Sequence, residues 1–158
     1  MKYLLVAAVL SAGFCLGQEK YSGPEPAKAD LPYLLHASTL LPTEAAEAKQ
    51  EDKKEISTYM VPGTASNVRT PLAEPIFLLK TEKLAPERLS LYRMELKDGQ
   101  RQVSFNTKKP KDNPRPVPLS VKRLGQGIYR IEANEMMQPG EYCLSPEGSN
   151  QVFCFQVY

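Results

Sequence analysis

The sequence predicts an all-β fold, an antiparallel β-sandwich of about seven to nine strands. Three observations lead to this fold class. The chain contains 14 prolines among its 158 residues, which disfavours long uninterrupted helices. Short apolar or alternating segments are separated by Gly, Pro, Asn and Asp turn signals. Two cysteines near the C-terminus, Cys143 and Cys154, occupy positions that suit directly opposed strands.

Residues 1–17, MKYLLVAAVLSAGFCLG, have the composition of a secretory signal peptide. Lys2 precedes an apolar run, and small residues follow, so we expect cleavage after Gly17. Cys15 is a candidate for lipidation, but the bulky Phe14 directly before it argues against a lipoprotein signal. The run is too short for a membrane anchor, and no other segment is apolar enough to span a membrane. The chain is therefore predicted to be exported, to the periplasm or outside the cell.

The next residues, 18–30, are polar and interrupted by Pro and Gly, which predicts a flexible tether. Residues 31–158 remain for a single β-sandwich domain, a length that allows one core. Within it, residues 31–37 (LPYLLHA) form a short apolar run and a predicted strand. Residues 64–74 read as a loop. Residues 75–81 (PIFLLKT) are the most continuously apolar run after the signal, and predict a central strand buried on both faces.

Residues 43–54 (TEAAEAKQEDKK) allow two interpretations. Ala, Glu, Lys and Gln are good helix formers and Thr43 suits an N-cap, so we favour a short surface helix. Only three alanines are apolar, however, so no strong face would dock, and the segment could equally be the exposed arm of a long hairpin. A strand pattern resumes at residues 56–61.

Two hairpins are predicted in the second half of the chain before the closing one. Residues 89–106 contain Asp98-Gly99, a strong signal for a two-residue type I′ turn. Leu89 and Leu91 are out of phase with the apolar residues that follow, so we expect a β-bulge near Leu91. Residues 119–133 form the other hairpin, closed by Gly125-Gln126-Gly127. The predicted cross-strand pairs are Lys97–Gln100, Met94–Val103, Tyr92–Phe105, Val121–Ile131 and Leu119–Ala133.

Residues 138–158 (QPGEYCLSPEGSNQVFCFQVY) predict a closing hairpin for which two registers compete. A three-residue loop would set Cys143 opposite Gln151, whereas a four-residue loop over 147–150 sets Cys143 opposite Cys154. The second register places four apolar side chains on one face and both sulfurs on the other: Tyr142, Leu144, Phe153 and Phe155. We choose it and predict a Cys143–Cys154 disulfide, which needs an oxidising compartment. Two free buried cysteines are the alternative.

Residues 107–118 (TKKPKDNPRPVP) form a predicted loop with four cations: Lys108, Lys109, Lys111 and Arg115. One interpretation is a contact patch for an anionic polymer or headgroup, and the simpler one is a solvated loop stiffened by proline. The loop has no interleaved aromatic residues, as base stacking requires. Acids and bases nearly balance over the chain, at 18 and 20. We therefore expect no nucleic-acid partner.

Two segments carry a resemblance to known proteins. Residues 127–131 (GIYRI) followed by 138–144 (QPGEYCL) resemble small exported bacterial β-sandwich proteins, in which a G-x-Y-x-x strand precedes P-G-E-Y and a final hairpin. Residues 70–79 (TPLAEPIFLL) are similar to uncharacterised secreted proteins of the acidobacterial kind. The resemblance covers the last two-thirds of the chain and implies an Ig-like or transthyretin-like sandwich without catalytic residues. Cys143 departs from the family, where an apolar residue is usual.

A non-enzymatic envelope module for protein or surface interaction is the predicted function. The alternative is a carrier or binder of a small apolar ligand, held between the sheets or under residues 43–54. The sequence lacks G-x-S-x-G and H-E-x-x-H motifs, and its single histidine, His36, has no nearby partner motif and reads as a strand side chain at the sheet surface. We therefore predict no enzymatic activity, no metal site and no cofactor, and an unidentified envelope or extracellular protein as partner.

Overall fold

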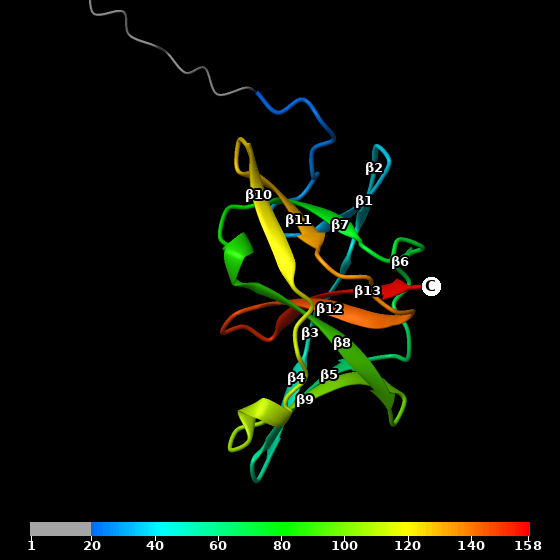
Figure 1. Ribbon diagram of the computed structural model, residues 1–158, viewed down its shortest axis with the longest axis vertical. Coiled ribbons are helices and arrows are strands. Elements are labelled where there is room, and N and C mark those ends of the chain that lie inside the picture. The colour runs from blue at the N-terminus through cyan, green and yellow to red at the C-terminus, as the bar shows by residue number, and fades with distance from the viewer. Residues whose placement is uncertain (1–19) are drawn as a thin grey trace, which may run out of the picture.

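The computed structural model describes residues 20–158, so the predicted signal peptide and Cys15 lie outside the described residues. The chain folds into two antiparallel sheets, as predicted for the all-β class, and its helical structure there is limited to two single 3₁₀ turns (Figure 1). Residues 20–158 contain 13 strands, more than the predicted seven to nine, because several strands are only two to five residues long. The strands are β1 (Tyr33–His36), β2 (Thr39–Pro42), β3 (Glu44–Glu47), β4 (Lys49–Lys53), β5 (Ile56–Pro62), β6 (Arg69–Thr70), β7 (Ile76–Lys80), β8 (Leu89–Lys97), β9 (Gln100–Asn106), β10 (Leu119–Gly125), β11 (Ile128–Ala133), β12 (Gly140–Pro146) and β13 (Gln151–Val157). The 3₁₀ turns are η1 (Pro86–Arg88) and η2 (Pro110–Asp112).

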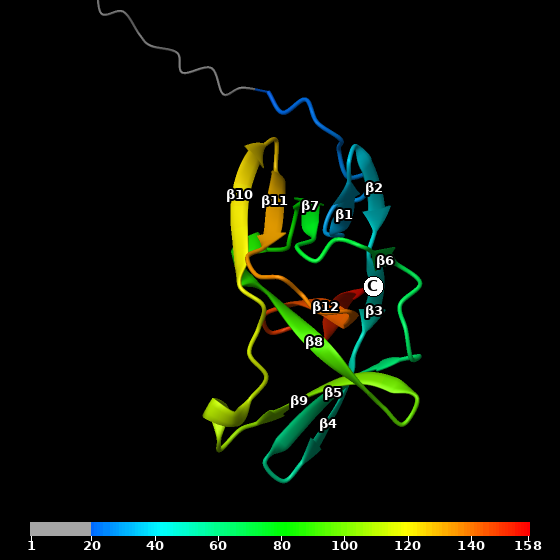
Figure 2. The same ribbon diagram turned by 45° about the vertical axis from the view of Figure 1, so that its right-hand side comes forward.

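The first sheet has five strands in the order β10-β11-β7-β1-β2. Strand β7 is the central strand of this sheet. Its residues Phe77, Leu78 and Leu79, which point alternately to the two faces of the sheet, are all buried, and this confirms the prediction of a central strand buried on both faces. Val121 pairs with Ile131 in the β10–β11 hairpin, as predicted. This sheet lies at one end of the molecule (Figure 2).

Residues 20–30, which the sequence predicts as a tether, make several contacts with this sheet. The Glu25 carboxylate pairs with the Lys80 ammonium at 2.6 Å. The Lys28 backbone N–H donates to the Tyr33 hydroxyl at 3.2 Å. The Asp30 carboxylate accepts three backbone N–H groups of residues 82–84, and these bonds hold its pKa below the usual value despite the opposing effect of burial. The part of the segment from Glu25 to Asp30 is therefore attached to the domain.

The second sheet curls into a closed ring. Its strand order is β3-β13-β12-β8-β9-β5-β4, with β6 added in parallel beside β13. The two ends of this order, β3 and β4, are consecutive in the chain and are separated only by Ala48. The Ala48 backbone N–H donates to the Asn150 carbonyl at 2.7 Å. The pairing partner changes at Ala48: β3 before it pairs with β13, and β4 after it pairs with β5. We call this arrangement the strand ring; β4, β5 and β9 lie at the opposite end of the molecule from the five-stranded sheet (Figure 2).

Residues 43–54 complete the ring as strands, so the favoured helix is wrong and the alternative, an arm of a hairpin, is confirmed. From residue 44 to residue 49, burial alternates: Glu44, Ala46 and Ala48 are more buried than Ala45, Glu47 and Lys49, which is a period of two and not of 3.6. Thr43 does not cap a helix; its buried hydroxyl donates to the Pro32 carbonyl at 2.7 Å. Pairing with β13 and β5 outweighs the helix propensity of Ala, Glu and Lys, which amounts to less than about 1 kcal/mol per residue.

The predicted loop over residues 64–74 also contains a short strand, β6, whose Arg69 and Thr70 pair in parallel with Gln156 and Val157. A two-residue strand that joins a sheet by a non-local pairing has no periodic sequence signal. Its position explains why His36 is half-buried: the His36 Nε2 and Thr70 Oγ1 atoms lie 2.8 Å apart.

The two faces of β8 serve two separate cores. Leu89 and Leu91 are buried in a core between the sheets, whereas Met94 is buried in a second core inside the strand ring. The pairing of β8 with β12 runs without interruption from Leu89 to Met94. The expected bulge near Leu91 is therefore wrong: the change of phase in the sequence marks a change of core, not a break in the strand.

The turn at Asp98-Gly99 forms as predicted, with Lys97 opposite Gln100 and both turn residues at positive φ, 53° and 74°. The pairing of β8 with β9 extends only from Lys97 to Glu95, so the predicted Met94–Val103 pair lies outside it. Farther from the turn, the Leu91 carbonyl of β8 accepts from Val117 of the loop that follows β9. The predicted neighbours Tyr92 and Phe105 still meet, with ring centroids 5.2 Å apart.

Candidate functional site

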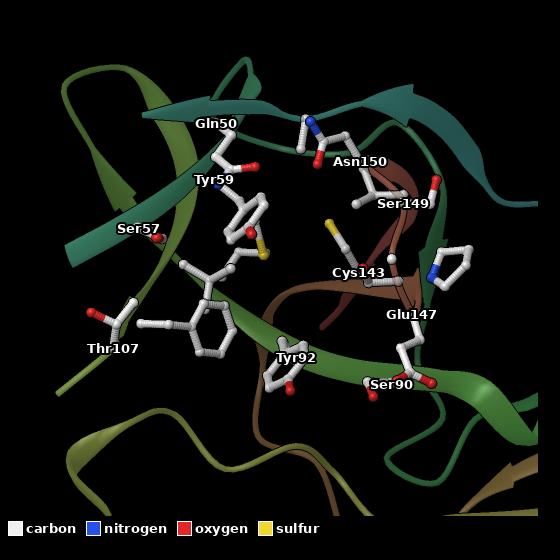
Figure 3. Close-up of a pocket in the computed structure, with 18 residues that line it drawn as sticks. Gln50, Ser57, Tyr59, Ser90, Tyr92, Thr107, Cys143, Glu147, Ser149 and Asn150 are labelled. Carbon is white, nitrogen blue, oxygen red and sulfur yellow. The ribbon is translucent and has the colours of Figure 1, made fainter. Parts of the chain in front are cut away.

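The strand ring encloses a cavity of about 570 Å³ that opens to solvent at one end. We call it the ring cavity. Its walls come from β4, β5, β8, β9, β12 and β13, and the β12–β13 turn borders its mouth (Figure 3). The residues that line it are Ala48, Gln50, Ser57, Tyr59, Ser90, Tyr92, Met94, Val103, Phe105, Thr107, Cys143, Val152 and residues 145–150.

Three aromatic rings form one cluster in the cavity wall. The Phe105 ring lies edge to face against Tyr59, with centroids 6.0 Å apart, and against Tyr92, with centroids 5.2 Å apart. Met94 and Val103 are buried beside them. Aromatic and aliphatic walls with a small number of polar groups are the usual lining of small-molecule sites.

The floor of the cavity contains the disulfide. The Cys143 and Cys154 sulfurs are bonded, with an S–S distance of 2.00 Å, and both residues are almost fully buried. The register Cys143↔Cys154 with the loop over residues 147–150 is the predicted one. Tyr142, Leu144, Phe153 and Phe155 lie in the core between the sheets, as predicted, while the sulfur face points into the strand ring. The disulfide therefore closes the hairpin and separates the cavity from the other end of the ring.

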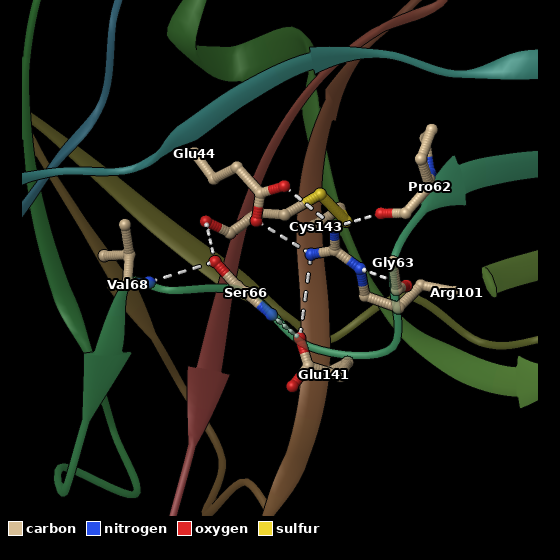
Figure 4. Close-up of polar contacts among 9 residues, drawn as sticks. Glu44, Pro62, Gly63, Ser66, Val68, Arg101, Glu141 and Cys143 are labelled. Atoms are coloured by element: carbon tan, nitrogen blue, oxygen red, sulfur yellow. Dashed lines mark hydrogen bonds and ion pairs between the residues drawn. A yellow bond between two sulfur atoms is a disulfide. The ribbon is translucent and has the colours of Figure 1, made fainter. Parts of the chain in front are cut away.

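That other end is filled by a buried ion cluster of Arg101, Glu44 and Glu141 (Figure 4). The Arg101 side chain is 1% exposed, and its guanidinium donates to both Glu44 carboxylate oxygens, at 2.8 and 2.9 Å. It also donates to the Pro62 and Gly63 carbonyls, at 2.8 and 3.2 Å. The second carboxylate, Glu141, lies 3.7 Å from the guanidinium. A bidentate carboxylate and two carbonyls satisfy most of the donors of the buried cation.

Within this cluster the pKa values of the two carboxyl groups shift in opposite directions. The Arg101 hydrogen bonds hold the pKa of Glu44 below its usual value. Burial raises the pKa of Glu141, against the lowering effects of the Ser66 backbone N–H and of Arg101. The Ser66 N–H donates to Glu141 Oε2 at 2.9 Å, but Oε1 has no hydrogen-bond partner among residues 20–158. The buried Arg101 is therefore bound tightly by Glu44, whereas Glu141 lacks a hydrogen-bond partner for one of its oxygens.

Sequence reasoning did not identify this cluster, although one signal for it exists. Arg101 has the same strand parity as Val103 and Phe105, so it faces the inside of the ring with them. A charged residue in phase with an apolar face needs a buried partner. The partners, Glu44 and Glu141, lie 57 and 40 positions away, so only the folded ring brings them to Arg101.

The loop over residues 107–118, which we call the basic loop, borders the ring cavity on one side. It begins at Thr107, which lines the cavity, and its end returns to β8, where the Val117 backbone N–H donates to the Leu91 carbonyl at 2.8 Å. Leu91 lies between Ser90 and Tyr92, both of which line the cavity. The loop therefore connects the β9 wall to the β8 wall, and Figures 1 and 2 show it beside β9.

Two asparagines hold the basic loop in shape. The Asn106 side-chain oxygen accepts the backbone N–H groups of Lys108 and Lys109, both at 2.9 Å, and the Asn113 side-chain oxygen accepts the Asn106 N–H at 2.6 Å. All four predicted cations of the loop are exposed. The Lys108 ammonium pairs with Glu55 at 2.5 Å, while Lys109, Lys111 and Arg115 form no ion pair within the part of the chain that the structure describes.

The described residues contain no group of three or more His, Cys, Asp or Glu side chains arranged for a metal ion. None of the helices in residues 20–158 has the length and hydrophobicity needed to cross a membrane. The chain matches no protein-family model, no curated protein and no solved structure.

Proposed function

We propose that this protein is an exported, non-enzymatic binding module that takes the apolar or aromatic part of a small ligand into the ring cavity. This is the alternative function predicted from sequence, and the cavity lies under residues 43–54, one of the two places suggested for it. The observation that carries the proposal is a cavity of about 570 Å³ with Tyr59, Tyr92 and Phe105 in its wall. Ligand sites of soluble proteins have volumes of roughly 300–1,000 Å³ and a similar lining.

Two features support the exported part of the proposal. A buried disulfide persists in oxidising compartments and is rare in the cytosol. The signal-like residues 1–17 would direct the chain to such a compartment.

The proposal can be tested with Prodan, a neutral dye whose emission depends on solvent polarity. We expect its emission to shift to the blue and to saturate at one dye per protein. Ser57→Trp places a large side chain in the cavity wall and is expected to weaken Prodan binding by about tenfold or more. The matched control is Thr58→Trp on the neighbouring residue, whose side chain bonds to Ser104 on the opposite face of the sheet.

Thermal unfolding of both variants checks that they fold, and Ser90→Phe provides a second blocking substitution on a different strand. Prodan binding that is equal in the wild type, Ser57→Trp and Ser90→Phe would overturn the cavity as the site.

The predicted interaction module is the second candidate, and the edges of the five-stranded sheet are the observation that favours it. Strand β10 ends that sheet and pairs only with β11 among the described strands. However, it carries Lys122 and Arg123 and a register shift next to Arg123. Charged residues and bulges on an edge strand oppose pairing with another protein. Binding of a partner protein by strand addition is therefore less well supported than binding of a ligand in the cavity.

A further inference from the structure

The basic loop and the ring cavity are adjacent, and their chemistry is complementary. The cavity wall is apolar and aromatic in its deep part, and Glu147 is the only charged residue among those that line it. Among residues 20–158, no cationic side chain lines the cavity, so an anionic group of a ligand would have no buried counterion there. The charge-bearing part of a ligand would have to remain at the mouth.

Charged residues of both signs lie around the mouth, and some of them are paired with each other while others are not. The Glu147 carboxylate pairs with Arg88 at 2.7 Å, and Lys108 pairs with Glu55. On the β4–β5 side, the Asp52 carboxylate accepts from the Gln50 amide at 3.1 Å. The remaining cations of the basic loop lie between Thr107, which lines the cavity, and Val117, which bonds to Leu91 of β8.

Three of those cations, Lys109, Lys111 and Arg115, have no ion-pair partner among residues 20–158, and the loop itself contains a single acid, Asp112. Two asparagines and the Val117–Leu91 bond keep the loop against β9 and β8, which carry Phe105 and Tyr92 of the aromatic wall. An anionic group at the mouth would therefore meet an excess of positive charge while the body of the same molecule reached the aromatic cluster.

We infer that the ligand of the ring cavity is a small anionic amphiphile, whose alkyl or aryl body enters the cavity and whose carboxylate, sulfonate or phosphate lies at the basic loop. This inference rests on the proposed function and specifies the chemical class of its ligand. It joins the predicted anionic contact loop and the predicted apolar ligand site into one site.

The test uses three ligands that share one body: 4-phenylbutyrate, 4-phenylbutan-1-ol and 4-phenylbutylammonium. Each is titrated against the wild-type protein by displacement of Prodan, and directly by chemical-shift changes in NMR spectra. We expect the carboxylate to bind about 5-fold more tightly than the alcohol, and the ammonium to bind most weakly, because each exposed charge contributes only modestly. The preference is expected to shrink as salt is raised.

The variant Lys109→Gln/Lys111→Gln/Arg115→Gln is expected to remove the preference for the carboxylate and to leave the affinity for Prodan unchanged. The matched control Lys97→Gln/Lys122→Gln/Arg123→Gln lowers the net charge equally, at the C-terminal end of β8 and on β10, and is expected to keep the preference.

Equal affinities for carboxylate and alcohol, or a preference that survives in the loop variant, would overturn the ligand class while Prodan binding still supports the cavity. A third arm measures sedimentation with vesicles of phosphatidylcholine and 20% phosphatidylglycerol. Sedimentation that depends on the loop and is unaffected by Ser57→Trp would place the loop on a membrane surface and would also overturn the inference. No sedimentation, together with a carboxylate preference, would support it.

Discussion

Glu141 is the residue of the strand ring whose hydrogen-bonding capacity is least satisfied. Its side chain is buried, one of its oxygens has no partner in the described chain, and Arg101 is already bound by Glu44. A protonated carboxyl fits this position better than an ionised one, which is why burial raises the pKa. Protonated Glu141 therefore stabilises the folded protein. This contribution is complete at pH values below the ordinary pKa of 4.5, and it is lost as the pH rises through the raised pKa of the folded state.

The substitution Glu141→Gln replaces the titrating group by a neutral one of the same shape. We expect the variant to gain stability relative to the wild type as the pH rises from 4 to 8, to about 1 kcal/mol at the upper end. Urea unfolding at a series of pH values measures this difference. A difference that does not change with pH would contradict the assignment of a raised pKa to Glu141.

Glu44→Gln is the control, and its pH dependence has the opposite sign. Arg101 lowers the pKa of Glu44, so the contribution of this carboxylate is present above 4.5 and is lost as the pH falls through the lowered value. The variant is expected to lose about 2 kcal/mol at pH 7, where the charged hydrogen bonds to Arg101 are broken, and to lose less in acid.

At the scale of elements, the β12–β13 hairpin combines a turn, a register and a covalent bond. The disulfide joins residues 11 positions apart in the chain, on strands that also pair with β8 and β3. Its main effect is expected on the unfolded chain, whose freedom it restricts.

The double substitution Cys143→Ala/Cys154→Ala is expected to cost about 2–3 kcal/mol of stability in urea unfolding. Peptide mapping provides the companion measurement: alkylation in denaturant is expected to label neither cysteine before reduction and both after it. Labelling of both cysteines without reductant would show that the bond is absent in the purified protein.

For the whole molecule, the important property is that the chain builds two cores on opposite faces of β8 and β12. Leu91 is fully buried between the sheets, and Met94, three residues later, lies in the wall of the ring cavity. Truncation in a filled core leaves a new void, whereas truncation beside an existing cavity enlarges a space that already exists.

Leu91→Ala is therefore expected to destabilise the protein by about 3 kcal/mol or more, and Met94→Ala by about 1–2 kcal/mol. Only Met94→Ala is expected to change the emission of bound Prodan. Urea unfolding and dye titration of the two variants separate these effects. Equal destabilisation with unchanged dye binding in both would contradict the division into two cores.

Much of the fold follows from local sequence signals. Asp98-Gly99 and Gly125-Gln126-Gly127 form turns, and the alternating residues around them determine the cross-strand pairs. The four-residue loop before Gln151 determines the pairing of the two cysteines in the same way. In each case the signal is local because a turn and a period of two act on neighbouring residues. The basic loop was also predicted within its boundaries, although its position beside the cavity was not.

The sequence by itself determined the all-β class, the hairpin turns with the registers next to them and the cysteine pair, because each depends on residues close together in the chain. The tertiary structure alone decided that residues 43–54 are strands, that Leu91 and Met94 serve different cores, and that Arg101 is buried between Glu44 and Glu141. The common physical reason is closure of the strand ring. It joins β3 and β4 to strands distant in sequence, and burial on the inside of that ring overrides the local preferences of the residues that form it.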